Sequence, residues 1–289
     1  MKQLLILSGK GGTGKTTVAS AFIKLSGAKA FADCDVDAPN LHLIMGQKCE
    51  PRRKDYFGMP KAEIDSDLCI QCNQCAEHCR FDAISVDSSG TYGIDKFDCE
   101  GCGVCEFICP VGAITLKPEA SGELMLYNKD DKVFSTAQLK MGSGHSGMLV
   151  TEVKRQMKDA AGNTELAIID GSPGIGCPVI ASLSGVDTVL VVTEPSISGI
   201  SDMERIIKTA EVFGTKIAVC VNKYDTNPAN TEKIEEFCLS RGLPFVGKIP
   251  FDTEAVKAIN NGMTIVDVDC RSGRAAREVF KNTMEVLSE

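Results

Sequence analysis

The sequence predicts an α/β fold in which a mainly parallel sheet, flanked by helices, is interrupted by a small cysteine-rich α+β module. Short apolar runs of strand length alternate with stretches of helical periodicity on both sides of the module. Strands that are buried on both faces of a parallel sheet have such continuous apolar runs. A glycine-rich loop follows the first apolar run, and eight of the 14 cysteines lie between Cys69 and Cys109.

The elements before the module follow the order strand, loop, helix and strand. The apolar run at 4–7 is only four residues long and leads into the glycine loop, so it predicts a strand and not a signal peptide. A helix is expected from about Lys15, and the segment AKAFADCD predicts the second strand.

The elements after the module continue the same alternation. The runs ELAIIDG, DTVLVVTE and KIAVCVNK predict buried strands, and 201–213 has apolar residues at helical spacing. Residues 47–60 and 135–147 contain proline, glycine and charged residues and are expected to be connectors, with a returning helix at 148–160. We therefore expect an α/β domain of residues 1–61 and 118–289, and an inserted module of residues 62–117.

Composition limits the classes of function. The net charge of −8 argues against a nucleic-acid partner, which requires a basic face. The chain has no run of about 18 apolar residues, so we expect no membrane insertion and a cytoplasmic location. Fourteen cysteines without an export signal favour metal binding over disulfides.

The glycine-rich loop has the spacing of a phosphate-binding site. Its glycines allow backbone N–H groups to surround phosphate oxygens, and the following helix N-terminus adds positive potential. Lys15 is expected to reach the β- and γ-phosphates, and the Thr16 hydroxyl to bind Mg²⁺. The candidate residues of this loop are Gly9, Gly11, Gly12, Thr13, Gly14, Lys15, Thr16 and Thr17.

The loop also carries a second lysine, Lys10, and so resembles the deviant Walker A motif K-G-G-x-G-K-T of the MinD/ParA/nitrogenase-iron-protein superfamily. The resemblance implies a P-loop ATPase that binds ATP and Mg²⁺. It also implies that Lys10 crosses a dimer interface and stabilises transition-state charge, as an arginine finger does. Hydrolysis is then expected to need a homodimer, or a heterodimer with a related ATPase.

Further motifs extend the resemblance along both outer parts of the chain. The segment from Asp33 to Asp37 is similar to the family's switch I, with Asp35 nearer Mg²⁺ and Asp37 acting on the attacking water. Asp170 matches the Walker B aspartate that holds Mg²⁺ through water, and Gly174 matches the glycine that senses the γ-phosphate. The resemblance thus implies a catalytic set of Lys10, Lys15 and Asp37.

Base recognition has two readings. Asn222 begins an N-K-x-D segment that looks like the guanine-reading motif of GTPases. In the MinD family the corresponding asparagine contacts adenine, helped by a later proline segment that Pro250 and Asp252 match. The second reading is favoured, which implies ATP.

The cysteine-rich window contains a tandem repeat of 30 residues. C-x₂-C-x₂-C-x₃-C is the bacterial ferredoxin motif, in which the fourth cysteine of each run ligates the other cluster. Zinc sites use two separated cysteine pairs, which this spacing does not match. The resemblance to two-cluster ferredoxins implies two [4Fe–4S] clusters. One has the ligands Cys69, Cys72, Cys75 and Cys109, and the other has the ligands Cys99, Cys102, Cys105 and Cys79.

One further cysteine is a candidate ligand. Cys177 follows Gly174 closely, and in the nitrogenase iron protein a cysteine just beyond switch II ligates a cluster that bridges the dimer. No second cysteine lies near 140–145, where Met141 and His145 stand. A bridging cluster on Cys177 is therefore kept only as an extra possibility.

The combined motifs resemble the ferredoxin-domain-containing ATPases of the MinD superfamily. They imply an ATPase that couples nucleotide-dependent dimerisation to electron transfer through two clusters, with a redox or metalloprotein partner. The alternative is an ATP-dependent carrier that assembles iron–sulfur or metal clusters. Such carriers use a C-x-x-C pair outside any ferredoxin module, and the sequence of this chain has no such pair. A MinD/ParA-like positioning ATPase is a third reading.

Overall fold

The computed structural model describes residues 1–47 and 49–289. These residues separate into two compact units. The first unit consists of Met1–Arg53, Leu124–Gln138 and Ser146–Glu289, and the second of Lys54–Glu123 and Leu139–His145.

The first unit is built on a largely parallel sheet. Within the described residues the strands of this sheet are β1 (Lys2–Leu7), β2 (Ala30–Asp33), β3 (Arg52–Phe57), β8 (Ala120–Lys129), β9 (Lys132–Leu139), β10 (Leu166–Asp170), β11 (Thr188–Thr193), β12 (Lys216–Asn222) and β13 (Phe245–Ile249). Lys54–Phe57 of β3, Ala120–Glu123 of β8 and Leu139 of β9 belong to the second unit. Their order across the sheet is β13-β12-β11-β1-β10-β2-β9-β8-β3, and neighbours from β13 to β9 pair in parallel. This arrangement confirms the predicted parallel sheet.

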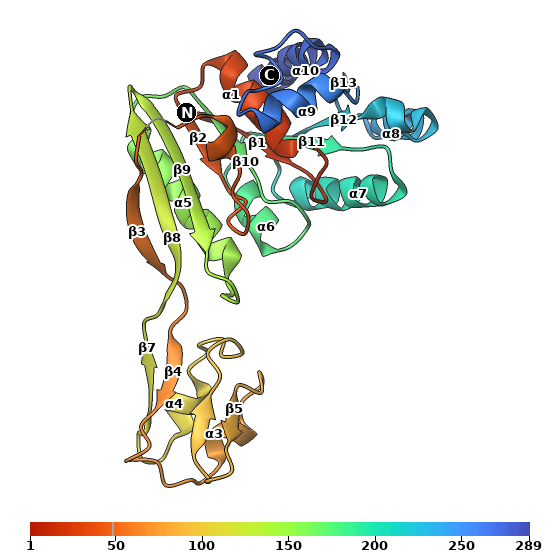
Figure 1. Cartoon of the computed structure of the whole chain (residues 1–289). Coiled ribbons are helices and arrows are strands. Elements are labelled where there is room, and N and C mark those ends of the chain that lie inside the picture. Colours follow the sequence, from red (N-terminus) through yellow and green to blue (C-terminus); the bar gives the residue numbers. More distant parts are fainter. Residues whose placement is uncertain (48) are drawn as a thin grey trace. The chain divides into compact units, whose positions relative to one another are not determined.

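Helices cover both faces of this sheet (Figure 1). One face carries α1 (Lys15–Ser26) and α10 (Arg271–Ser288), and the other carries α5 (Ser146–Ala160), α6 (Cys177–Leu183) and α7 (Ile197–Val212). The remaining helices of the unit are α2 (Leu41–Ile44), α8 (Pro228–Arg241), α9 (Thr253–Asn260) and the 3₁₀ turn η1 (Tyr224–Thr226). Because both faces are covered, β11 is buried along its whole length and β1 is buried from Leu4 to Leu7.

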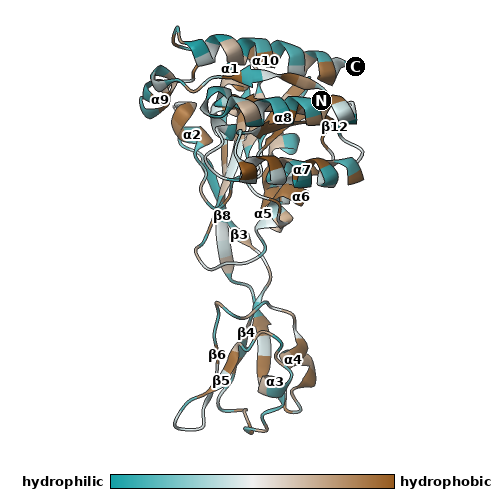
Figure 2. Ribbon diagram, turned by 90° about the vertical axis from the view of Figure 1, so that its right-hand side faces the viewer, coloured by the Kyte–Doolittle hydropathy of each residue, from teal (hydrophilic) through white to brown (hydrophobic). Residues whose placement is uncertain are grey.

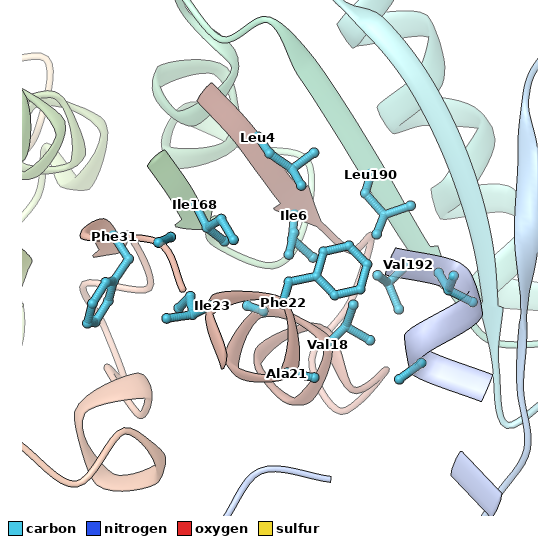
Figure 3. Packing of buried hydrophobic residues seen from close by; sticks show 14 of the residues in the cluster. Leu4, Ile6, Val18, Ala21, Phe22, Ile23, Phe31, Ile168, Leu190 and Val192 are labelled. Atoms are coloured by element: carbon cyan, nitrogen blue, oxygen red, sulfur yellow. The ribbon is translucent and has the colours of Figure 1, made fainter. Parts of the chain in front are cut away.

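The core under α1 fixes the position of the glycine loop. Figure 3 shows Phe22 and Val18 of α1 packed against Leu4 and Ile6 of β1, with Leu190 of β11 beside them. All of these side chains are almost fully buried. The loop between β1 and α1 is therefore anchored at both of its ends by the core.

The two segments that were expected to be connectors are partly strands, so that expectation was wrong for 52–57 and 135–139. β3 lies at the edge of the sheet and buries only Tyr56, while its charged residues face solvent. An edge strand needs no continuous apolar run, and charges there oppose unwanted pairing. β8 and β9 are joined by Asp130 and Asp131, which both have positive φ, as a tight hairpin turn requires.

The second unit consists of two similar halves. Its elements are β4 (Lys61–Ile64), α3 (Gln74–Glu77), β5 (Ile84–Val86), β6 (Tyr92–Ile94), α4 (Val104–Ile108) and β7 (Ile114–Lys117). β4 pairs with β7 and β5 pairs with β6, both antiparallel, so the halves exchange strands. Each half places a short helix between its two strands.

The hydrogen bonds of the two halves repeat at the 30-residue offset found in the sequence. The N–H of Asp65 donates to Ala113 O at 2.8 Å, and the N–H of Asp95 donates to Ala83 O at 2.8 Å. The residues before both helices, Asn73 (φ 63°) and Gly103 (φ 79°), are left-handed. The duplication in the sequence is thus a duplication of backbone structure.

None of the helices within residues 1–47 and 49–289 has the length and apolar character that crossing a bilayer requires.

Candidate functional site

The glycine loop lies at the carboxyl end of β1, in the middle of the sheet. In open α/β sheets this edge is where ligands bind. Gly14, at φ 90°, immediately precedes α1, and a Cβ added there would lie 2.2 Å from Asn222 Nδ2. The same Asn222 amide donates a hydrogen bond to Thr13 O at 2.7 Å. Glycine at 14 thus lets the end of β12 support the loop.

Lys15 makes a buried ion pair at the centre of the site. Its Nζ lies 2.6 Å from Asp170 Oδ1, at the end of β10, and both side chains are almost fully buried. Burial alone lowers the pKa of Lys15, but the charges of Asp170, Asp33 and Asp35 outweigh burial and raise it. Asp170 therefore contacts the Lys15 ammonium directly, and the nearby Asp33 and Asp35 favour its charged form.

Asp33, at the end of β2, is a buried carboxylate that sequence reasoning did not assign to the site. Its Oδ1 accepts the N–H of Asp35 at 3.0 Å, and its Oδ2 accepts the N–H groups of Asn40 and Leu41 at 3.0 Å. Burial, reinforced by the charge of Asp170, raises the pKa of Asp33 to about 7. Its position at the end of a strand, within the sequence DCDVD, is the sequence signal that could have identified it.

Oxygen atoms suited to a magnesium ion stand at the same place. Asp170 Oδ2 is buried and has no hydrogen-bond partner among the described residues. The Thr16 hydroxyl lies 3.4 Å from Lys15 Nζ, so it is part of the same cluster. Mg²⁺ prefers oxygen ligands and is usually bound through one or two carboxylates with retained waters. The residues present therefore fit a magnesium ion.

The other predicted switch residues, Gly174, Asp35 and Asp37, each have a different environment. The Gly174 N–H donates to Ser8 O at 3.0 Å, which ties the segment after β10 to the start of the glycine loop. Burial first, and neighbouring carboxylates, raise the pKa of Asp35, although Lys15 opposes them. Asp37 is exposed, and its backbone O accepts Gln138 Nε2 at 3.2 Å.

Lys10 points to a group that the sequence analysis missed. Its Nζ lies 2.6 Å from Glu194 Oε1 and within 3.1 Å of the hydroxyls of Ser196 and Ser198. Lys223 Nζ lies 3.6 Å from the other oxygen of Glu194 and donates to Gly12 O at 2.8 Å. Glu194 follows the apolar strand β11 directly, and that strand-end position is the sequence signal that identifies it.

The residues predicted to read the base line one hollow beside the loop. Asn222, Pro250 and Asp252 all contribute to it, in a space of about 690 Å³ that is partly open to solvent. The carboxylate of Asp252 is engaged in capping, since it accepts the N–H of Ser272 at 3.1 Å and of Glu254 at 3.0 Å. The N–H of Ser272, followed by that of Glu254, outweighs burial and lowers the pKa of Asp252.

Two further hollows lie in the second unit, and each is lined by four cysteines. The first hollow, of about 350 Å³, is lined by Cys69, Cys72, Cys75 and Cys109 together with apolar side chains. The second hollow, of about 370 Å³, is lined by Cys79, Cys99, Cys102 and Cys105. In each hollow the fourth cysteine comes from the other half of the repeat.

The thiols of each hollow interact electrostatically. Burial raises the pKa of Cys75, and the neighbouring Cys69 and Cys72 raise it further. Burial raises the pKa of Cys105 in the same way, with Cys99 and Cys102 adding to it. A soft cation would favour the thiolate form of such a group of thiols. The donor set of four cysteines in each hollow fits a [4Fe–4S] cluster.

No group of three or more histidine, cysteine, aspartate or glutamate side chains in the described part of the chain is placed to hold a single metal ion. The apolar core of the second unit is small: its buried members are Ala62, Ala83, Cys99 and Ile114, and several of the other hollow cysteines pack against them.

Cys177 is exposed and begins α6. A Cβ added to Gly147, at the start of α5, would lie 3.1 Å from Cys177 O. The other cysteines of the first unit are Cys34, Cys220, Cys238 and Cys270, which are buried, and Cys49, which is half-buried.

Comparison with known proteins identifies the family. The model of the CobQ/CobB/MinD/ParA nucleotide binding domain matches residues 4–265. An uncharacterized protein of Methanocaldococcus jannaschii is 33% identical over 294 residues, covering 99% of this chain and 97% of its own length. The iron-sulfur cluster carrier protein of the same organism is 22% identical over 301 residues, covering 98% of this chain and 84% of its own length.

A solved structure shares the fold. The cell division ATPase MinD of Pyrococcus furiosus superposes with a TM-score of 0.58 at 18% identity, covering 99% of both chains. Its relation to this chain is one of fold. Because the family model spans most of the chain, and the relative from M. jannaschii matches along almost its whole length, the protein belongs to the CobQ/CobB/MinD/ParA family of nucleotide-binding proteins.

Proposed function

We propose that the protein is an ATPase that couples MgATP binding and hydrolysis, in a nucleotide-dependent dimer, to electron transfer through two [4Fe–4S] clusters. One observation carries the proposal: a chain of a nucleotide-binding family contains two hollows, each lined by four cysteines in the ferredoxin pattern.

In this proposal the ferredoxin module is residues 62–117. Cys69, Cys72, Cys75 and Cys109 hold one cluster, and the cysteines of the second hollow hold the other. The clusters supply reversible one-electron transfer. The repeated hydrogen bonds and the exchanged strands support the assignment, because they bring the fourth cysteine of each half into the hollow of the other half.

The nucleotide site works through displacement of the ion pair between Lys15 and Asp170. The phosphates of ATP compete with Asp170 for the Lys15 ammonium, which lies 2.6 Å from the carboxylate. The Thr16 hydroxyl, and the Asp170 carboxylate through water, would hold Mg²⁺, which would neutralise charge on the phosphates. Gly174, which bonds Ser8 beside the loop, is placed to respond to the same change.

Hydrolysis requires Asp37 and Lys10. Asp37 orients the attacking water and accepts its proton. Lys10 leaves Glu194 and stabilises charge on the phosphates of the partner protomer. In this proposal the ion pair with Glu194 keeps the Lys10 side chain against its own protomer until a dimer forms.

A second candidate function is ATP-dependent assembly or delivery of iron–sulfur clusters. The observation that favours it is the likeness to a relative named iron-sulfur cluster carrier protein, which extends over 98% of this chain. The eight hollow cysteines argue against it, because a cluster bound by four thiolates is held too firmly to be a ready cargo.

The deciding experiment is an anaerobic EPR redox titration of the reconstituted protein, with and without MgATP. We expect two interacting [4Fe–4S]⁺ signals whose potential or line shape changes with MgATP. The matched control is Lys15→Ala, which keeps the cluster signals and loses the response to nucleotide. Absence of any iron–sulfur signal overturns the proposal. If the EPR signals do not change with MgATP and the clusters are transferred to an apo-ferredoxin, the carrier function is established instead.

A further inference from the structure

Asp225, the last residue of the N-K-x-D segment, is bound to the segment that follows β13. It lies in the turn η1, and its Oδ1 accepts the N–H of Phe251 at 2.7 Å. Among the described residues, Phe251 lines the hollow beside the glycine loop, whereas Asp225 does not. The carboxylate of Asp225 is therefore engaged by a neighbouring backbone and is not presented to the hollow.

The turn that carries Asp225 is held by hydrogen bonds on both sides of that residue. The N–H and the hydroxyl of Thr226 both donate to Lys223 O, at 3.0 Å and 2.8 Å. The Thr231 hydroxyl of α8 donates to Tyr224 O at 2.9 Å. Asp225 thus holds Phe251 from a backbone that is itself fixed.

Both backbone polar groups of Phe251 are bound. Asp225 accepts its N–H, and Arg271 Nη2, at the start of α10, donates to its O at 3.3 Å. The next residue, Asp252, accepts the N–H of Ser272 through Oδ2 at 3.1 Å. The segment 250–252 is therefore tied to α10 on one side and to η1 on the other, and Asp225 supplies the link to η1.

The same segment forms part of the apolar lining of the hollow. α9 carries hydrophobic as well as hydrophilic residues (Figure 2), and its Ala255, Val256 and Ile259 line the hollow. Pro250 and Phe251 line it from the segment that Asp225 holds. Apolar side chains of this kind suit a flat purine ring. A shift of the segment would change the space that the base occupies.

The carboxylates of this region are not free to read a base. Guanine presents its N1–H and its 2-amino group as donors, which a carboxylate facing the base would accept, whereas adenine has neither donor there. Asp252 is the one carboxylate among the described residues that line the hollow, and both of its oxygens accept backbone N–H groups. Asp225 is engaged by Phe251 in the same way. Guanine would leave donors unpaired in this site, which weakens its binding.

We propose that Asp225 is a positioning residue for base recognition, which holds the segment 250–252 at the hollow. Because its carboxylate is used in this way, the site accepts adenine and rejects guanine, although the N-K-x-D pattern is that of a guanine-reading segment. The inference rests on the proposed function, since it concerns the nucleotide that the ATPase binds. It assigns to Asp225 a role that acts through Phe251 and needs no contact with the base.

The test is calorimetric titration of the full-length reconstituted protein with Mg²⁺ and, in turn, ATP, GTP and XTP. The wild type should bind ATP roughly tenfold or more tightly than GTP, the scale of an unpaired buried donor. Asp225→Ala should weaken ATP binding roughly fivefold to tenfold, the scale of one lost hydrogen bond. Asp225→Asn should bind ATP nearly as tightly as the wild type, because an amide oxygen still accepts the Phe251 N–H.

XTP tests whether the side chain at position 225 reads the base directly. Xanthine has a carbonyl oxygen where guanine has its 2-amino group, so an amide that faced the base would favour XTP. Asp225→Asn should therefore gain no affinity for XTP. The matched control is Glu232→Ala, which removes the same charge from an exposed position on α8 and should leave ATP binding unchanged.

Each alternative has its own result. If Asp225→Ala is folded by circular dichroism and binds ATP as the wild type does, or if Asp225→Asn binds ATP as weakly as Asp225→Ala, the positioning role is wrong. If the wild type binds GTP as tightly as ATP, or if Asp225→Asn gains affinity for XTP, the carboxylate reads the base instead. These comparisons still decide the question if Asp225→Ala does not fold. A wild type that binds none of the three nucleotides contradicts the proposed function itself.

Discussion

At the scale of single residues, the site is a set of charges whose partners lie far away in the chain. Lys10 meets Glu194, and Lys15 meets Asp170, across 184 and 155 residues. The motif pattern of the sequence identifies both lysines but neither contact, because these depend on which strands lie beside β1 in the sheet. Asp33 is a similar case: a strand-end aspartate in the sequence, but a buried carboxylate in the fold.

We predict that Lys10→Ala retains ATP binding but lowers kcat by roughly a thousandfold or more, on the scale of an arginine finger. Glu194→Gln should raise turnover at low protein concentration, because it weakens the hold on Lys10 within its own chain. Nucleotide binding is measured by calorimetry, and turnover by phosphate release across protein concentrations. Lys208→Ala, on the exposed face of α7, is the control. Full turnover of Lys10→Ala contradicts the composite site.

We predict that Asp33 makes the protein less stable as pH rises from about 4 to about 7. Its pKa is raised from 3.8 to about 7 by burial and Asp170, so in this window the folded state keeps a proton that the unfolded state releases. The free energy of unfolding from this group is therefore fully present below about 4 and lost as pH passes about 7.

The measurement is urea unfolding between pH 5 and 8, followed by circular dichroism because the chain lacks tryptophan. The wild type should lose stability across the window relative to Asp33→Asn, in which position 33 does not titrate. Equal slopes for the two proteins contradict the assignment.

At the scale of elements, periodicity predicts buried strands and amphipathic helices well. The predicted helix at 148–160 is α5 (Ser146–Ala160), and the continuous apolar runs are β10, β11 and β12. Edge strands were missed: β3 has no apolar pattern, since only one of its six residues is buried. The short helices α3 and α4 have only four and five residues, too few for amphipathic periodicity to predict them.

The proposed clusters should supply much of the order of the second unit, because its buried apolar core consists of a few small residues and cysteine. We predict that anaerobic removal of iron by a chelator abolishes backbone protection in the elements from β4 to β7, while β1, β10 and β11 keep theirs. The reason is that metal binding then supplies much of the folding free energy of this unit.

Hydrogen exchange monitored by mass spectrometry checks this for each segment. The control is Cys220→Ala, which changes a buried cysteine of the first unit and should leave iron content intact. If the backbone amides of the second unit stay protected from exchange after iron is removed, its apolar core alone maintains its order and the prediction is wrong.

At the scale of the whole molecule, the sequence by itself determined the α/β class, the glycine loop after the first strand, and the repeat of cysteines. These follow from local spacing: apolar periodicity, a phosphate-binding motif and a duplicated unit are all visible along the chain. Only the tertiary structure decided which side chains meet. It brings Asp33 near Lys15 and Asp170, turns Lys10 towards Glu194, and adds the fourth cysteine to each hollow. The physical reason is that strand order and strand exchange place distant residues side by side, and neither is encoded in any short window of sequence.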